Sequence, residues 1–342
     1  MGHKKKNSDN RDLHQQAYDR LKGMQSFGDS KSEDKKYDRD HDTDTTAGKI
    51  YSYSTYKTYW KHIKYFLKWV QKTHSEIKKL DKAEKLVPEW LQTRVDENLS
   101  AWTVQTEAAA LNKLYGIKTD DPKRFQPPQR RKEDIIRSRG TKERDKHFSE
   151  KKNEELVNFC KGCGFRRNVL EKLIGSDLYD RNKVESALEK ARADGDQPIV
   201  KACTDALKTF PDKEYFVLHR NDKGGKTRIS PIVGPNTDKI VERMKNTAPD
   251  EKVWQYVSGN CDVHGYRADY ATYLYKEYAR PVEELSFKNK IKCADGKYRS
   301  EIYTCRGDEA GKKLDRQAIG VISIALGHNR EDTAISNYVR NL

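Results

Sequence analysis

LGHNREDTAISNYVRNL, residues 326–342, is a short segment whose apolar side chains recur at helical spacing. Ile335, Tyr338 and Val339 would share one face of a helix there. These side chains can form the apolar stripe that packs a short helix. Alternatively, the helix presents Tyr338 as a nucleophile. The choice depends on which other side chains the chain brings to this helix.

The composition indicates a protein that binds a polyanion. The chain has 342 residues, enough for two domains, and its formal net charge is +15. Hydrophobic residues make up 35% of it and charged residues another 35%. No apolar run approaches the length of a membrane span, and no signal peptide precedes the first charges. We therefore expect a cytoplasmic protein with no membrane partner.

The six cysteines do not indicate a disulfide framework in a chain of this size. Cys160 and Cys163 form one CxxC, but no second CxxC or histidine pair follows at zinc spacing. Cys293 and Cys305 lie twelve residues apart. A structural zinc is the alternative, but we expect reduced, partly buried thiols and predict no metal site and no cofactor.

The first third of the chain predicts a tail followed by a helical domain. Residues 1–48 are almost all polar and predict a mobile charged tail, apart from a short helix across His14–Met24. Residues 49–118 predict a small all-helical domain, because apolar residues recur at helical spacing from Tyr56 to Val70. Further helices are expected at 83–97 and 100–115, the last between a Ser100 N-cap and a Gly116 C-cap.

Basic residues mark two candidate DNA-binding segments. One stripe of the first long helix carries only lysines, which face either solvent or phosphate. Residues 119–147 are rich in Pro, Arg and Lys and predict a basic linker that follows a phosphate backbone. The predicted DNA-binding residues are Lys57, Lys61, Lys64, Lys68, Arg130, Arg131 and Lys132.

Residues 148–342 predict a larger α+β domain. YFVLHRNDKGGKTRISPIV, residues 215–233, has apolar strand segments on both sides of Asp222–Lys226, which predicts a β-hairpin with a Gly-Gly turn. Residues 286–313 are rich in Gly and Lys and predict an extra hairpin or loop. Helices are expected at 149–162, 183–208, 236–246, 264–279 and 315–326. The predicted fold class is mainly α with a small β-sheet or hairpin.

Five stretches, in chain order, resemble the tyrosine recombinase (phage integrase) family. CGFRRNVLEKLIGSDL at 163–178 resembles its first box, VHGYRADYATYL at 263–274 its second and LGHNREDTAISNY at 326–338 its third. NDKGGKTRISPIVG at 221–234 resembles the hairpin that carries the family's active-site lysine. STYKTYWKHIKYFLKW, with SAWTVQTEAAALNKLYGI, resembles its helical core-binding (SAM-like) domain. The resemblance spans roughly 50–342 and implies a core-binding domain and a catalytic domain that form a clamp on DNA.

The register of the first box can be checked within the sequence. Shifting the box arginine from Arg166 to Arg167 breaks every other match, so Arg166 is the predicted residue. With Arg166 as the box arginine, the family's leucine, leucine, acidic and apolar positions fall on Leu170, Leu173, Asp177 and Leu178.

The resemblance implies an electrostatic site for a phosphodiester. Arg166 and Arg267 would hold the non-bridging oxygens, because a guanidinium makes bidentate bonds to phosphate and stays charged. His264 shares a helix face with Arg267 and would donate a hydrogen bond or handle the tyrosine proton. His328 would donate to a non-bridging oxygen from the opposite side.

The remaining roles concern the bonds that form and break. Tyr338 would form a covalent 3′-phosphotyrosine, which keeps the bond energy so that rejoining needs neither ATP nor metal. Lys223, on the hairpin, would protonate the leaving 5′-oxygen. Val169 departs from the pattern, since the family usually carries there an acidic residue that orients the arginine. Residues 180–210 and 286–313 are insertions relative to the family.

The implied function is a site-specific DNA recombinase or integrase of a mobile genetic element. It would cleave, exchange and rejoin double-stranded DNA at recombination sites, as a homotetramer on two sites in the nucleoid, with an accessory DNA-bending or directionality factor as a further partner. Two alternatives stay open. One is a catalytically silent DNA-binding regulator with the same fold, and the other is a type IB topoisomerase-like enzyme.

Overall fold

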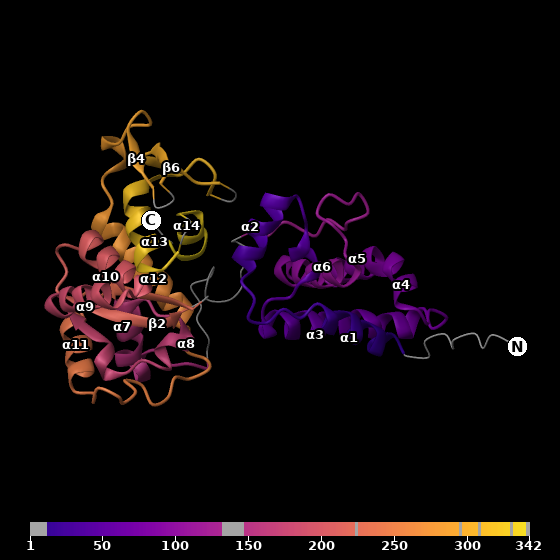
Figure 1. The fold of residues 1–342 in the computed structure, drawn as a ribbon, viewed down its shortest axis with the longest axis horizontal. Coiled ribbons are helices and arrows are strands. Elements are labelled where there is room, and N and C mark those ends of the chain that lie inside the picture. The colour runs from indigo at the N-terminus through magenta and orange to yellow at the C-terminus, as the bar shows by residue number, and fades with distance from the viewer. Residues whose placement is uncertain are drawn as a thin grey trace, which may run out of the picture. The chain divides into compact units, whose positions relative to one another are not determined.

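The computed structural model describes residues 12–131, 147–222, 225–293, 296–306, 309–328 and 331–339. The chain divides into two compact units, Met1–Arg130 and Arg131–Leu342 (Figure 1). Helices dominate both units, and small antiparallel sheets lie in the second. The predicted fold class, mainly α with small β-sheets, is therefore confirmed.

Helices are the main regular elements of the first unit's described residues, which also hold one isolated β-bridge between Gln25 and Ile50. Its longest helix, α3, begins at the Ser52 N-cap, whose hydroxyl accepts from the Thr55 N–H, and buries one apolar face. The third predicted helix is confirmed as α6, which ends at Gly116 with φ 69°. The helices are α1 (Leu13–Gly23), α2 (Lys31–His41), η1 (Thr45–Gly48), α3 (Tyr53–Thr73), α4 (Leu80–Ala83), η2 (Glu84–Leu86), α5 (Val87–Asp96) and α6 (Ala101–Tyr115).

The short helix predicted across His14–Met24 is confirmed as α1, whereas the mobile tail predicted for the rest of 1–48 is wrong at 31–41 and 45–48, which form α2 and η1. Leu13, Ala17 and Leu21 are four residues apart and buried in the same core as α3 and α6. Burying each leucine stabilises the unit by about 2 kcal/mol, enough to order a short helix. Composition obscured α2 instead, because its residues are almost all polar and none of them is buried.

The second unit builds a sheet and two further hairpins among its helices. Its strands are β1 (Leu178–Asp180), β2 (Tyr215–Asp222), β3 (Lys226–Pro231), β4 (Lys290–Lys292), β5 (Tyr298–Ser300), β6 (Ile302–Thr304) and β7 (Lys313–Asp315). Its helices are η4 (Lys151–Asn153), α7 (Glu154–Cys163), α8 (Arg167–Leu170), η5 (Gly175–Asp177), α9 (Arg181–Asp194), α10 (Gln197–Thr209), α11 (Thr237–Lys245), α12 (Val263–Tyr278), η6 (Val282–Glu284), α13 (Arg316–Ala325) and α14 (Glu331–Tyr338).

The predicted β-hairpin is confirmed as β2 and β3, which pair antiparallel in a sheet of order β1-β2-β3. The pairing shifts by one residue, from His219 opposite Arg228 to Asp222 opposite Lys226. In this β-bulge two residues of β2, Arg220 and Asn221, lie opposite one residue of β3, Thr227, and Asn221 has a φ of 47°. Because the bulge adds one residue, both of these pairs lie on the same face of the hairpin, His219 with Arg228 and Asp222 with Lys226.

Helix α12 is the centre of the second unit and packs against α7, α13 and α14. Its first turn is capped by Asp262, whose carboxylate accepts from the Gly265 N–H at 3.0 Å. The 180–210 segment forms α9 and α10, and α10 packs on β3 and α13. The described part of 286–313 belongs to two small hairpins, β4–β5 and β6–β7.

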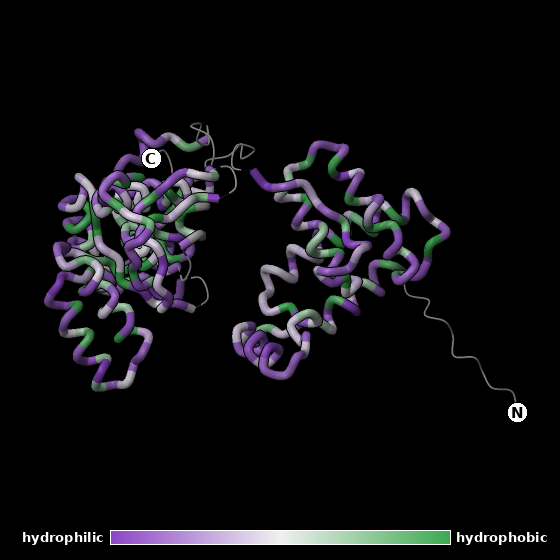
Figure 2. The backbone as a smooth tube through the Cα atoms, turned by 90° about the horizontal axis from the view of Figure 1, so that it is seen from above, coloured by the Kyte–Doolittle hydropathy of each residue, from purple (hydrophilic) through white to green (hydrophobic). Residues whose placement is uncertain are grey.

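Hydrophobic and hydrophilic residues alternate along the helices of both units (Figure 2). Across the described ranges, no helix combines the length and the apolar character needed to cross a membrane.

Candidate active site

Tyr338 lies against two histidines that come from different helices. The centre of its ring is 5.2 Å from that of His264, in the first turn of α12, and the two rings are perpendicular. It is also 5.2 Å from the ring centre of His328, which follows α13. Tyr338 is 5% exposed, so α14 holds its side chain inside the unit. Both predicted histidines are therefore neighbours of the predicted tyrosine.

Arg267 lies one turn along α12 from His264 and is completely buried. Its guanidinium donates to the carbonyls of Gly164 and Leu326, the latter at 2.6 Å, and its central carbon lies 5.2 Å from the Tyr338 ring centre. Burial, reinforced by nearby arginine charge, lowers the pKa of Arg267 to about 9, so it stays positive at neutral pH. Arg267 thus places a fixed charge beside the tyrosine.

The loop after α7 directs the neighbouring side chains of Arg166 and Arg167 to different partners. Gly164 caps α7 at φ 62°, where a side chain would collide with the Tyr270 ring. Arg166 then reaches the buried carboxylate of Asp222, with Nη1 2.5 Å from Oδ2. Arg167 instead donates to carbonyls in 257–261, the loop before α12. The structure therefore puts Arg166, and not its neighbour, next to the hairpin.

Two site residues were not predicted from the sequence. Asp222 is 2% exposed and contacts both Arg166 and Arg228. Arg228, on β3, also donates to the carbonyls of Ala325 and Gly164 and contacts His219 Nδ1 at 2.8 Å. Strand alternation places Asp222 and His219 on opposite faces, so only the bulge brings them together. A lone Asp beside a predicted turn gave no signal of this role.

The side chains around Tyr338 form a cluster that carries more positive than negative charge. Its members are Arg166, Asp222, Arg228, His264, Arg267 and His328. Arg228 and Arg267 both donate to the Gly164 carbonyl, while Asp222 is the carboxylate that ion-pairs with Arg166 and Arg228. Burial and these arginines lower the pKa of His328 to about 3, so its imidazole is neutral at pH 7. Such a site favours an anionic ligand, which would offset the excess charge.

Buried donors without a hydrogen-bond partner also favour an anionic ligand. Two of the buried atoms that have no hydrogen-bond partner in the described structure lie beside Tyr338, namely His328 Nε2 and Arg267 Nε. Each can donate to an oxygen that enters the site. Arg166 keeps 17% of its side chain exposed, and Lys226 is exposed on β3, so this side of the cluster reaches solvent.

The predicted Lys223 lies outside the described residues, between β2 and β3. Its neighbour Asp222 belongs to the cluster described above. A second lysine of the hairpin, Lys226, places its Nζ 3.4 Å from the Gly327 carbonyl, in the turn that precedes His328. The hairpin therefore meets the predicted third box, and the position of Lys223 stays a prediction.

The predicted DNA-binding residues belong to a different surface. The four α3 lysines are exposed, and Lys57, Lys61 and Lys64 each lie within 5.6–5.9 Å of an aromatic ring centre, at Tyr53, Tyr65 and Trp60. Farther along the chain, Arg130 and Arg131 are exposed, Arg130 lies 5.8 Å from the Trp102 ring, and Lys132 is outside the described residues.

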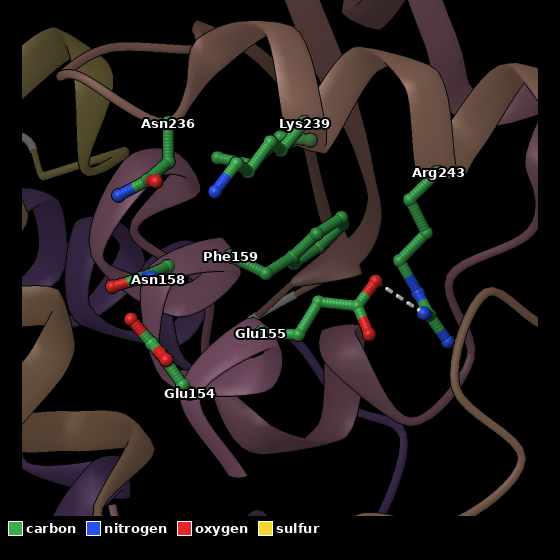
Figure 3. A pocket seen from close by; sticks show the side chains of 8 residues that line it. Glu154, Glu155, Asn158, Phe159, Asn236, Lys239 and Arg243 are labelled. Atoms are coloured by element: carbon green, nitrogen blue, oxygen red, sulfur yellow. Dashed lines mark hydrogen bonds and ion pairs between the residues drawn. The ribbon is translucent and has the colours of Figure 1, made fainter. Parts of the chain in front are cut away.

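A pocket elsewhere in the second unit shares no residue with this cluster. It lies between α7 and α11, and the ion pair of Glu155 with Arg243 lines one side (Figure 3).

The six cysteines are free, with Cys160 and Cys163 buried on α7. Within the described ranges, no group of three or more His, Cys, Asp or Glu could hold a metal.

Comparison with known proteins leaves the family open. No family model and no curated protein matches the chain. Among solved structures, the crystal structure of XerA recombinase matches over 95% of this chain and 94% of that one, with 15% sequence identity and a TM-score of 0.26. A superposition at this level does not establish a shared fold or activity.

Proposed function

We propose that the chain is a tyrosine recombinase that cleaves and rejoins DNA through a covalent phosphotyrosine. One observation carries the proposal: Tyr338 is in contact with His264, His328 and Arg267, which come from segments far apart in the sequence. A structural tyrosine does not need two histidines and an arginine around its ring. A tyrosine that attacks a phosphodiester needs fixed donors of this kind.

The proposed reaction assigns one role to each of these residues and one to Lys223. The phenolic oxygen of Tyr338 attacks the phosphorus, its proton passes to His264, and the bond from phosphorus to the 5′-oxygen breaks. Lys223 gives the 5′-oxygen its proton. Arg166, Arg267 and neutral His328 stabilise the charge on the non-bridging oxygens. The number of phosphodiester bonds is unchanged, so the reverse attack by a 5′-hydroxyl rejoins the strand.

The finer proposal is site-specific exchange between two DNA sites by a homotetramer, with the helical unit and its α3 lysines on the DNA backbone. The described hairpins of 286–313 are the candidate contact between protomers. Their base is held by ion pairs of Arg280 with Glu301 and Asp315. An accessory directionality factor and integration of a mobile element belong to the same proposal.

The decisive experiment does not require a known target site. A randomised duplex library with a nick in each strand is incubated with the protein, denatured in detergent and scored for protein-bound DNA. Covalent complexes in the wild type, absent in Tyr338→Phe, are the expected result. Binding without a covalent complex would identify a DNA-binding regulator.

A second experiment separates exchange from relaxation. The sequence recovered from the library is placed on two plasmids and on one supercoiled plasmid. Recombinant products that need both sites are expected of a recombinase. Relaxation of supercoils without recombinants would identify a topoisomerase-like enzyme.

A further inference from the structure

We propose that Asp222 is the positioning residue for Arg166, so the hairpin supplies the orienting carboxylate for the arginine that acts on phosphate. This inference rests on the proposed function. At the position three residues after Arg166 the chain carries Val169, which is buried and apolar. Asp222 reaches Arg166 from β2, in a part of the sequence 56 residues away, with Nη1 2.5 Å from Oδ2.

The bulge in β2 explains how this carboxylate reaches the site. Without the extra residue, Asp222 would lie on the face of the hairpin opposite His219. The shift in register, with Asn221 at φ 47°, turns Asp222 inward, where it is 2% exposed. Bulges redirect side chains in this way next to functional sites, and the left-handed backbone at Asn221 is tolerated because asparagine adopts it more readily than most residues.

Asp222 also joins Arg166 to the rest of the cluster. Its Oδ2 accepts from Arg228 Nε at 3.2 Å, and Arg228 in turn donates to the carbonyls of Ala325 and Gly164. A side chain at Gly327, after Ala325, would lie 2.8 Å from Arg228 Cδ, so the turn before His328 packs directly on this arginine. One carboxylate therefore fixes Arg166 relative to the turn that carries His328.

Asp222 is buried, so it would act on DNA only through Arg166 and through its charge. Its loss should therefore lower the cleavage rate without lowering the affinity for DNA. Asp222→Asn leaves Arg166 without its ion-pair partner, and the cleavage rate at saturating DNA falls by about 10- to 100-fold, the range for residues that orient an active group. The same change removes a negative charge from the cluster. Affinity for duplex DNA therefore stays the same or rises. A merely structural defect would lower both.

A double-mutant cycle tests the inference. Cleavage is measured under single-turnover conditions on the nicked duplex that the wild type traps, for Asp222→Asn, Arg166→Ala and the double variant. If Asp222 acts through Arg166, the double variant cleaves within about threefold of Arg166→Ala alone. Equal further slowing by Asp222→Asn in both backgrounds would overturn the inference. No covalent complex with the wild type would instead overturn the proposed function, and this inference with it.

Two further variants keep the test sound if Asp222→Asn unfolds. Asp222→Glu keeps the charge and adds one methylene, and we expect it to recover at least half of the lost cleavage on a logarithmic scale. The matched control is Glu107→Gln, which neutralises another buried carboxylate, paired with Arg94 in the first unit, outside the cluster. It should lower Tm but leave the cleavage rate of the folded protein within about threefold. Equal slowing in the control would reduce Asp222 to a structural role.

Discussion

The central guanidinium carbon of Arg267 lies 5.2 Å from the centre of the Tyr338 ring. The contact places a permanent positive charge beside the side chain that would carry the covalent bond. Such a charge draws an anionic phosphate toward the same place and stabilises charge that develops there. Arg267 is held by the carbonyls of Gly164 and Leu326, so it is oriented before any DNA arrives.

Tyr338→Phe should abolish covalent complexes while DNA affinity and Tm change little. The phenyl ring keeps the contacts with both histidines and loses only the hydroxyl. Covalent complexes are counted on a denaturing gel, with and without protease. Tyr273→Phe, at an exposed tyrosine of α12, is the control and should cleave normally. A covalent complex formed by Tyr338→Phe would mean that another residue attacks.

Arg166→Ala should slow cleavage by at least about 100-fold, or roughly 3 kcal/mol, because one preorganised donor to the phosphate is lost. Arg166 is a cleaner test than Arg267, since it keeps 17% of its side chain exposed and binds no backbone carbonyl in the described structure. Single-turnover cleavage is measured beside Arg167→Ala, which should lower Tm through the 257–261 loop and slow cleavage far less. The opposite order would move the catalytic role to Arg167.

The motifs of the sequence named the residues that the structure brings to Tyr338, but not the two residues that the β2–β3 hairpin adds. The resemblance implied His264, Arg267 and Tyr338, and in the structure His264 and Arg267 share a face of α12 while Tyr338 is the last residue of α14. Asp222 and Arg228 could not be predicted, because strand alternation does not reveal a bulge. Helix α2 was missed for another reason, since its residues are almost all polar and none of them is buried.

Replacing Lys57, Lys61, Lys64 and Lys68 with Gln should weaken binding to any duplex and flatten its salt dependence. Each lost phosphate contact lowers the magnitude of the log–log slope by about one. Binding is measured by titration between about 50 and 200 mM salt. The matched control replaces four exposed lysines of the same unit outside α3: Lys35, Lys36, Lys82 and Lys85. Equal slopes for both variants would show that the α3 lysines only face solvent.

His328 should make the protein less stable in acid. Burial and the charges of Arg267 and Arg166 lower its pKa to about 3, below the ordinary value of 6.5. The unfolded chain takes up this proton below about pH 6.5 and the folded protein does not. The contribution of His328 to the free energy of unfolding is therefore fully present above pH 6.5. It falls as the pH drops from 6.5 toward 3, by at most about 1.4 kcal/mol per pH unit.

The measurement is urea unfolding at pH 7 and pH 5. Between these values the wild type should lose more stability than His328→Gln, which has no imidazole to protonate. His41→Gln, at an exposed histidine of α2, should lose as much as the wild type. Equal losses in all three proteins would show that His328 does not couple folding to pH.

The two hairpin lysines should differ in the step that they affect. Lys223→Ala should slow cleavage by about 100-fold or more, because a general acid for the 5′-oxygen is lost. Lys226→Ala removes an ammonium group whose Nζ lies 3.4 Å from the Gly327 carbonyl, and it should slow cleavage about tenfold at most.

A duplex with sulfur in place of the bridging 5′-oxygen distinguishes these roles. A thiolate leaves without a proton, since thiols are far more acidic than alcohols. On this duplex Lys223→Ala should cleave at nearly the wild-type rate, while the smaller defect of Lys226→Ala should persist. Rescue of Lys226→Ala, with Lys223→Ala still slow, would assign the acid to Lys226.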